Sequence, residues 1–155
     1  MKRTTATAVI AVGQLVLVGV AVAPQLSART LGDTYLVRVA PVDPIDPFRG
    51  AYVALDYPDL HLDDPRSHEG RRDVYVTLVE RDGVWVAGDW TRERPGDGPY
   101  LACDAGSWQV RCGIESWFLP QDEARETERL LQDGAVAELR IDSRGNAAVV
   151  DVRAP

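Results

Sequence analysis

The chain has 155 residues and a formal charge of −7, with 24 acidic side chains against 17 basic ones. All 24 acidic residues lie beyond residue 28, where 15 arginines oppose them, so residues 29–155 carry a formal charge of −9. Such a charge argues against binding to nucleic acid and against docking onto an anionic membrane surface. This part of the chain is long enough for one domain with its own core and too short for two.

The first 28 residues form an apolar segment. No charged residue occurs between Arg3 and Arg29, and Gln14 is the only polar residue in the centre of the segment. As a helix, residues 7–23 extend about 25 Å, and the residues on either side bring the length towards the ~20 residues that cross a bilayer. We therefore expect a helix that contacts the membrane through residues 6–26.

Two interpretations of this segment compete, a cleaved signal peptide and a retained anchor. Ala21 and Ala23 suit a signal peptidase, but Pro24 would then become the first mature residue, which peptidases handle badly. Cleavage after Ala28 would place Leu26 poorly. The apolar core is also longer than the roughly 7 to 15 residues of a signal peptide. The sequence therefore favours the retained anchor.

The charges on either side of the segment predict its orientation. Lys2 and Arg3 precede it, whereas Arg29 alone follows it directly. The positive-inside rule then keeps the N-terminus in the cytoplasm. We expect a single-pass protein of the cell membrane, with residues 1–28 as a transmembrane signal-anchor and residues 29–155 as an extracytoplasmic domain.

Residues 29–155 contain short runs with strand character, separated by turn-prone residues. The clearest is a hairpin in which Val74, Val76 and Leu78 share one face and Arg81-Asp82-Gly83 turns the chain. About eight strands are expected from nine such runs, which are 34–42, 51–57, 73–80, 84–90, 99–103, 108–112, 114–120, 135–142 and 147–153.

One helix is expected in this domain, over residues 120–132, because acidic residues open it, Arg129 lies near its end and Gly134 follows as a stop. Strands and helices do not alternate, which argues against a parallel sheet. The expected fold class is mostly β (α+β): an antiparallel barrel- or sandwich-like domain with one short helix, preceded by one transmembrane helix.

The two cysteines, Cys103 and Cys112, are expected to form a disulfide, because the domain is exported and no C-x-x-C spacing occurs. Direct pairing centres the loop on Ser107-Trp108, whereas the turn-forming residues centre nearer Ala105-Gly106. Since the Cα atoms of a disulfide lie within about 7 Å, the loop between the strands must be asymmetric.

Catalytic and metal-binding patterns are weak. The only lysine is Lys2, which excludes a Ser-Lys dyad outside the membrane, and no G-x-S-x-G motif occurs. No carboxylate pair stands out for hydrolysis. The loop 56–69 is rich in potential ligands for Ca²⁺ or Zn²⁺, but their spacing matches no defined site and we expect a solvated loop with neither metal nor cofactor. These ligands are Asp56, Asp59, His61, Asp63, Asp64, His68 and Glu69.

The stretch "PFRGAYVALDY" at residues 47–57 carries the most specific pattern. Gly50 permits a tight turn, Leu55 and Tyr57 are expected on the core-facing side of a strand, and Tyr52 on the opposite side. The spacing Gly50-x-Tyr52-x-x-Leu55-x-Tyr57 resembles the signature of the bacterial GDYXXLXY-motif family, with Ala51 in place of the family's aspartate.

A second block, "CGIESWFLP" at residues 112–120, is similar to that family's Gly-Ile-Glu segment with its aromatic pair and proline. The resemblance assigns a structural or partner-binding role to the motif residues of both blocks. These residues are Arg49, Gly50, Tyr52, Leu55, Tyr57, Gly113 and Glu115.

The resemblance implies a membrane-anchored envelope protein and no particular reaction. Family members are often encoded beside a polytopic membrane protein. The expected function is therefore that of a non-enzymatic module that binds a polytopic membrane protein or another envelope component. Two alternatives remain open, an envelope hydrolase that uses carboxylates and a domain that binds a metal or small ligand through residues 56–69.

Overall fold

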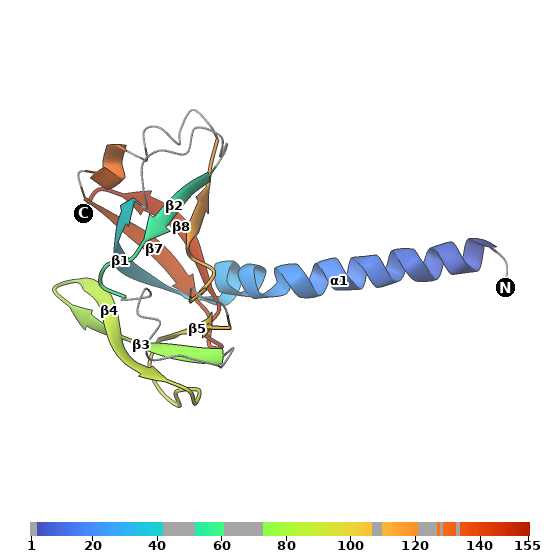
Figure 1. The fold of residues 1–155 in the computed structure, drawn as a ribbon, viewed down its shortest axis with the longest axis horizontal. Coiled ribbons are helices and arrows are strands. Elements are labelled where there is room, and N and C mark those ends of the chain that lie inside the picture. Colours follow the sequence, from blue (N-terminus) through green and yellow to red (C-terminus); the bar gives the residue numbers. More distant parts are fainter. Residues whose placement is uncertain are drawn as a thin grey trace.

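The computed structural model describes residues 3–41, 52–60, 73–106, 110–120, 127, 129–132 and 134–155. A long helix, α1 (Arg3–Leu31), is followed by a domain built mainly of β-strands. Figure 1 shows α1 projecting away from the domain, which contacts only its C-terminal end. Its last turns therefore join the apolar segment to the domain.

Helix α1 is long and apolar enough to cross a bilayer. The candidate span Thr7–Leu31 has 25 residues and contains an 18-residue window with a mean hydropathy of 2.1. As a helix, 25 residues extend about 37 Å against a hydrocarbon core of about 30 Å. Its large apolar side chains are exposed, for example Leu15 at 72%. The helix passes through Pro24 and continues to Leu31, beyond the expected boundary at residue 28.

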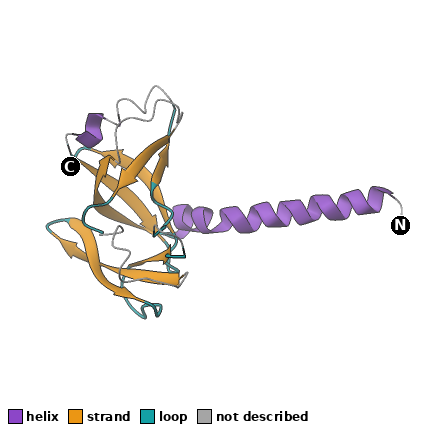
Figure 2. Cartoon of the chain, viewed as in Figure 1, coloured by secondary structure: helices purple, strands orange, loops and turns teal. Residues whose placement is uncertain are grey.

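The strands form two antiparallel sheets (Figure 2). The larger sheet has the order β6-β2-β1-β7-β8 and the smaller has the order β4-β3-β5. This arrangement confirms the expected antiparallel, barrel- or sandwich-like fold. The strands are β1 (Asp33–Pro41), β2 (Tyr52–Asp56), β3 (Asp73–Arg81), β4 (Val84–Thr91), β5 (Tyr100–Asp104), β6 (Ser116–Phe118), β7 (Ala135–Ile141) and β8 (Ala147–Arg153).

One core lies between the sheets. The expected hairpin is formed by β3 and β4, and Val74, Val76 and Leu78 of β3 are buried, as their alternation predicts. Positive φ angles of 53° at Asp82 and 80° at Gly83 turn this hairpin. The β3 residues join one buried cluster with side chains of the larger sheet.

Some expected elements differ in extent. Residues 114–120 contribute only the three-residue β6, and in the described part of 108–112 only Arg111 pairs, in a single bridge with Asp104. Of the expected helix 120–132, residues 127 and 129–132 are helical, Pro120 is not, and residues 121–126 and 128 lie outside the described residues. Gly134 follows with a φ of 93° and donates its N–H to the carbonyl of Leu131.

Gly32 alone separates α1 from β1. Its N–H donates to the carbonyl oxygen of Ala28 at 3.0 Å, which closes the helix. A Cβ atom at this position would lie 2.5 Å from that oxygen and 2.7 Å from the main-chain nitrogen of Ile141. The close packing of main chain against main chain therefore requires a glycine, and it leaves no linker between the helix and the sheet.

Candidate functional site

The C-terminal turns of α1 are held by the β domain at several points. The amide nitrogen of Gln25 donates to the carbonyl oxygens of Gly113, at 3.1 Å, and Ala147, at 3.2 Å. Ala28 is completely buried. On the β7 side, the guanidinium of Arg140 donates two hydrogen bonds to the carbonyl oxygen of Gly32, at 3.0 and 2.7 Å. The helix is thus fixed in orientation relative to the sheet.

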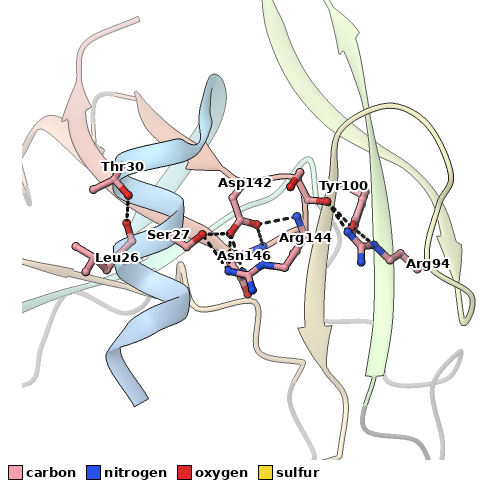
Figure 3. A network of polar contacts seen from close by, with 9 residues as sticks. Leu26, Ser27, Thr30, Arg94, Tyr100, Asp142, Arg144 and Asn146 are labelled. Carbon is pink, nitrogen blue, oxygen red and sulfur yellow. Dashed lines mark hydrogen bonds and ion pairs between the residues drawn. The ribbon is translucent and has the colours of Figure 1, made fainter. Parts of the chain in front are cut away.

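A buried carboxylate provides a second attachment. Asp142 begins the turn 142–146 between β7 and β8, which we call the junction turn, and its Oδ2 accepts a 2.5 Å hydrogen bond from the hydroxyl of Ser27 on α1 (Figure 3). The same carboxylate accepts the main-chain N–H groups of Arg144 and Asn146 and the side-chain amide of Asn146. Arg144 in turn donates to the hydroxyl oxygen of Ser27 at 3.1 Å.

These hydrogen bonds keep Asp142 ionised. Burial by itself raises the pKa of a carboxyl group, but the hydrogen bonds from Ser27, Asn146 and Arg144 outweigh it and lower the pKa of Asp142. The side chain is the one buried charged group among the described residues. Because Asp142 accepts hydrogen bonds from both α1 and the junction turn, it holds the helix end against this turn.

The junction turn also contacts the smaller sheet. The hydroxyl of Tyr100 on β5 donates to the carbonyl oxygen of Ser143 at 3.0 Å, and Arg94 donates to the Tyr100 hydroxyl oxygen and to the same carbonyl (Figure 3). The main-chain N–H of Ala102 on β5 donates to the carbonyl oxygen of Gly145, which has a φ of 80°. One turn therefore links the helix and both sheets.

The motif strand is β2, and its buried side chains belong to the core. Leu55 and Tyr57 are buried, as expected from their shared face. The Tyr57 hydroxyl donates to the carbonyl oxygen of Ile114, and the N–H of Leu55 donates to the carbonyl oxygen of Glu115 at 3.0 Å. Burial, together with the nearby carboxylates of Glu115 and Asp56, raises the pKa of the Tyr57 hydroxyl, so it remains a donor.

The second sequence block lies directly beside this strand. β6 pairs with β2, with Val53 opposite Trp117. The carboxylate of Glu115 accepts the N–H groups of Cys112 and Gly113, and Gly113 has a φ of 80°. Because the carbonyl oxygen of Gly113 also accepts a hydrogen bond from the Gln25 side chain, the block connects the motif strand to the C-terminal end of α1.

The two cysteines stand directly opposite each other. Asp104 and Arg111 exchange two main-chain hydrogen bonds, and in the next pair the Cα atoms of Cys103 and Cys112 lie 4.1 Å apart with their sulfur atoms at the disulfide distance of 2.02 Å. The pairing is symmetric at these positions. Residues 107–109, with the centre expected for direct pairing at Ser107-Trp108, lie outside the described residues, so the expected asymmetry of the loop stays a prediction.

Several predicted residues also lie outside the described residues: Arg49, Gly50, Ala51 and the loop residues 61–72, with His61 and His68. For Tyr52 the main chain alone is described, opposite Phe118 of β6. Asp59 forms an ion pair of 3.0 Å with Arg38. Among the described residues, no group of three or more His, Cys, Asp or Glu side chains is placed to hold a metal ion.

The sequence patterns do not indicate the junction. Gln25 and Ser27 fall within the expected anchor 1–28, and residues 143–146 only separate the expected strands 135–142 and 147–153. A polar pair at the end of an apolar helix is a signal that could have indicated a docked helix end, because a polar group at a buried contact needs a partner. Nothing local indicates that the partners lie more than 80 residues away.

Comparisons with known proteins place these features in a family. No curated protein and no solved structure is significantly similar to the chain. A family model described as "GDYXXLXY protein" matches residues 14–152, which include the last turns of α1, the motif strand, the second block and the junction turn. The chain therefore belongs to the GDYXXLXY family.

Proposed function

We propose that the protein is a membrane-anchored extracytoplasmic module that binds a polytopic membrane protein or another envelope component. The observation that carries this proposal is the junction: an exposed apolar helix of bilayer-spanning length enters the β domain without a linker. An exposed apolar surface of this size needs a lipid or protein environment. A rigid junction would hold the domain in one orientation at the membrane surface.

Among the described residues of the domain, one large apolar side chain beside the motif is exposed. Phe118 on β6, the edge strand of the larger sheet, is 73% exposed and stands opposite Tyr52 of the motif in the β2–β6 ladder. Large exposed aromatic side chains are typical contacts in protein interfaces. We therefore assign Phe118 and Tyr52 as partner contacts, whereas the buried Leu55 and Tyr57 support the strand that presents them.

The experiment has two stages. Alkaline carbonate extraction of cell membranes should leave the full chain in the membrane fraction, and added protease should digest the domain only from the extracytoplasmic side. Release of the chain by carbonate would contradict the anchor. Pull-down from detergent-solubilised membranes should then recover a multi-spanning partner in stoichiometric amount.

Variants connect the partner to the proposed surface. Phe118→Ser and Tyr52→Ala should weaken recovery of the partner while the domain stays folded. Val79→Ser provides the matched control, because Val79 is also an exposed apolar strand residue, at 39%, on the other sheet. Equal recovery with all three variants would exclude the β6 edge as the contact.

A further inference from the structure

The polar side chain at the centre of α1, Gln14, has no hydrogen-bond partner among the described residues. Gln14 is exposed between large apolar residues such as Leu15 and Val16, and no described residue bonds its amide. An amide in the hydrocarbon core of a bilayer has no water to bond with, and such residues in membrane helices usually face another helix. If α1 crosses the membrane, Gln14 needs a partner from outside this chain.

The helix geometry places Gln14 on a defined face. Gln25 follows it by eleven residues, about three turns, so both amides point to nearly the same side of the helix. Between them on this side lie Val18 and Ala21, and Ala11 precedes Gln14 by one turn. Small residues permit close approach of another backbone. We call Ala11, Gln14, Val18 and Ala21 the Gln14 face.

The Gln14 face continues an interface that the structure already shows. At Gln25 and at Ala28, one heptad after Ala21, the same side of the helix is covered by the β domain. Gln25 satisfies its amide there with two main-chain carbonyls. The packing surface of α1 therefore begins under the domain and runs on, uncovered, towards the N-terminus.

We infer that the Gln14 face packs against a membrane-spanning helix of a partner protein that offers a hydrogen-bonding group to the Gln14 amide. This inference rests on the proposed function and assigns the site of contact within the membrane. The partner group is a hydroxyl, an amide or a main-chain carbonyl, since each can pair with a neutral amide. The partner helix is defined by two features: it lies beside α1, and its extracytoplasmic end stops where the β domain covers Gln25 and Ala28.

A second copy of this chain does not meet these conditions. Two copies in one membrane have the same orientation, and pairing them through the Gln14 face would place each helix end where the other copy's domain covers Gln25 and Ala28. Figure 1 shows the domain extending on both sides of the helix axis at this end. A helix from another protein, with a short loop at this surface, avoids the overlap.

Photo-cross-linking in the full chain tests the inference. A photoreactive amino acid replaces Val18 on the Gln14 face, or Val16 on the opposite face, and the protein is irradiated in its native cell membranes. We expect a protein adduct from position 18 whose cross-linked peptide belongs to a membrane-spanning segment of another protein. Position 16 should give much less of it, because it lies on the opposite face of the helix and cannot reach a partner packed against the Gln14 face.

Substitutions then separate the hydrogen bond from general packing. Gln14→Leu should lower the adduct from position 18 by at least about threefold, whereas Val12→Leu on the opposite face should leave it unchanged. An adduct with a second copy, equal adducts from both faces, or an unchanged adduct in Gln14→Leu would each overturn the inference.

Failure of this inference differs from failure of the proposed function. If Gln14→Leu leaves both the adduct and the pull-down unchanged, the Gln14 amide does not contribute to the contact and the proposed function stands without it. If carbonate releases the unmodified chain from membranes, the anchor itself is wrong. Tryptophan fluorescence of each variant checks that the β domain stays folded, since all tryptophans lie beyond residue 84.

Discussion

The hydroxyl of Tyr57 donates a 2.8 Å hydrogen bond to the main-chain carbonyl oxygen of Ile114, and both residues are almost completely buried. This bond joins the last tyrosine of the family motif to the second sequence block, 57 residues further along the chain. The carbonyl oxygen of Gly113, the neighbour of Ile114, accepts a hydrogen bond from the side chain of Gln25 on α1. The motif tyrosine therefore supports the segment that holds the helix.

Tyr57→Phe should destabilise the domain by about 1 to 2 kcal/mol, because the buried carbonyl of Ile114 loses its donor. Tyr57→Ala should cost ~3 kcal/mol or more, because it also leaves a cavity. Urea unfolding of the full chain in detergent, followed by tryptophan fluorescence, measures both. A Phe variant as stable as the wild type would show that the hydrogen bond contributes nothing.

Gly32→Ala should destabilise the junction by about 1 to 3 kcal/mol or more. The added methyl group would meet main-chain atoms of Ala28 and Ile141, which cannot move aside as a flexible side chain would. The same unfolding experiment applies. Gly96→Ala is the control, because a Cβ atom at Gly96 meets nothing within 4 Å; an equal loss in both variants would contradict the explanation.

Asp142→Asn should lower stability in a pH-dependent way. The pKa of Asp142 is below its ordinary value of 3.8 in the folded protein, so the unfolded chain takes up the proton first as the pH falls. The ionised group therefore stabilises the fold fully above about pH 5, and this contribution is lost as the pH falls below about 4 towards the folded pKa.

Unfolding free energies of wild type and Asp142→Asn should accordingly differ most at neutral pH and converge in acid. Asp151→Asn serves as the control, because Asp151 is an exposed carboxylate in an ion pair of 3.5 Å with Arg153, and such pairs contribute little. A difference in unfolding free energy between wild type and Asp142→Asn that stays constant from pH 7 to pH 3 would show that the ionised form of Asp142 does not stabilise the fold.

Cys103 and Cys112 should be found oxidised in protein from the membrane, and reduction should destabilise the domain by roughly 2.5 kcal/mol in the chain-entropy model. Thiol labelling under denaturing, non-reducing conditions measures the oxidation state. The variant Cys103→Ala/Cys112→Ala should be insensitive to reductant. Two labelled thiols in the wild type would refute the prediction.

The apolar helix should remain attached to the mature protein. Cleavage after Ala28 would remove Gln25 and Ser27, and with them the hydrogen bonds to Gly113, Ala147 and Asp142. Intact-mass measurement of the protein extracted from membranes tests this directly. A mature N-terminus at Pro24 or Arg29 would show that a signal peptide is removed.

The features of the fold that could be predicted from the sequence are those that depend on residues close together in the chain. Alternation of Val74, Val76 and Leu78 identified β3 and its buried face, and Asp82-Gly83 identified the turn. The junction could not be predicted in this way, because Ser27 and Asp142 are 115 residues apart. Asp142 is locally the last residue of an expected strand, and nothing in the sequence around Gly32 indicates that Ile141 packs against it.

Because only Gly32 separates α1 from β1, the number of residues in α1 fixes the rotation of the β domain about the helix axis as well as its distance along that axis. Each residue of an α-helix advances about 1.5 Å and rotates about 100°. One residue added between Gln14 and Gln25 would barely change the span, yet it would turn the β domain by more than a quarter circle relative to Gln14. The number of residues between Gln14 and the junction therefore determines the direction in which the domain faces relative to Gln14.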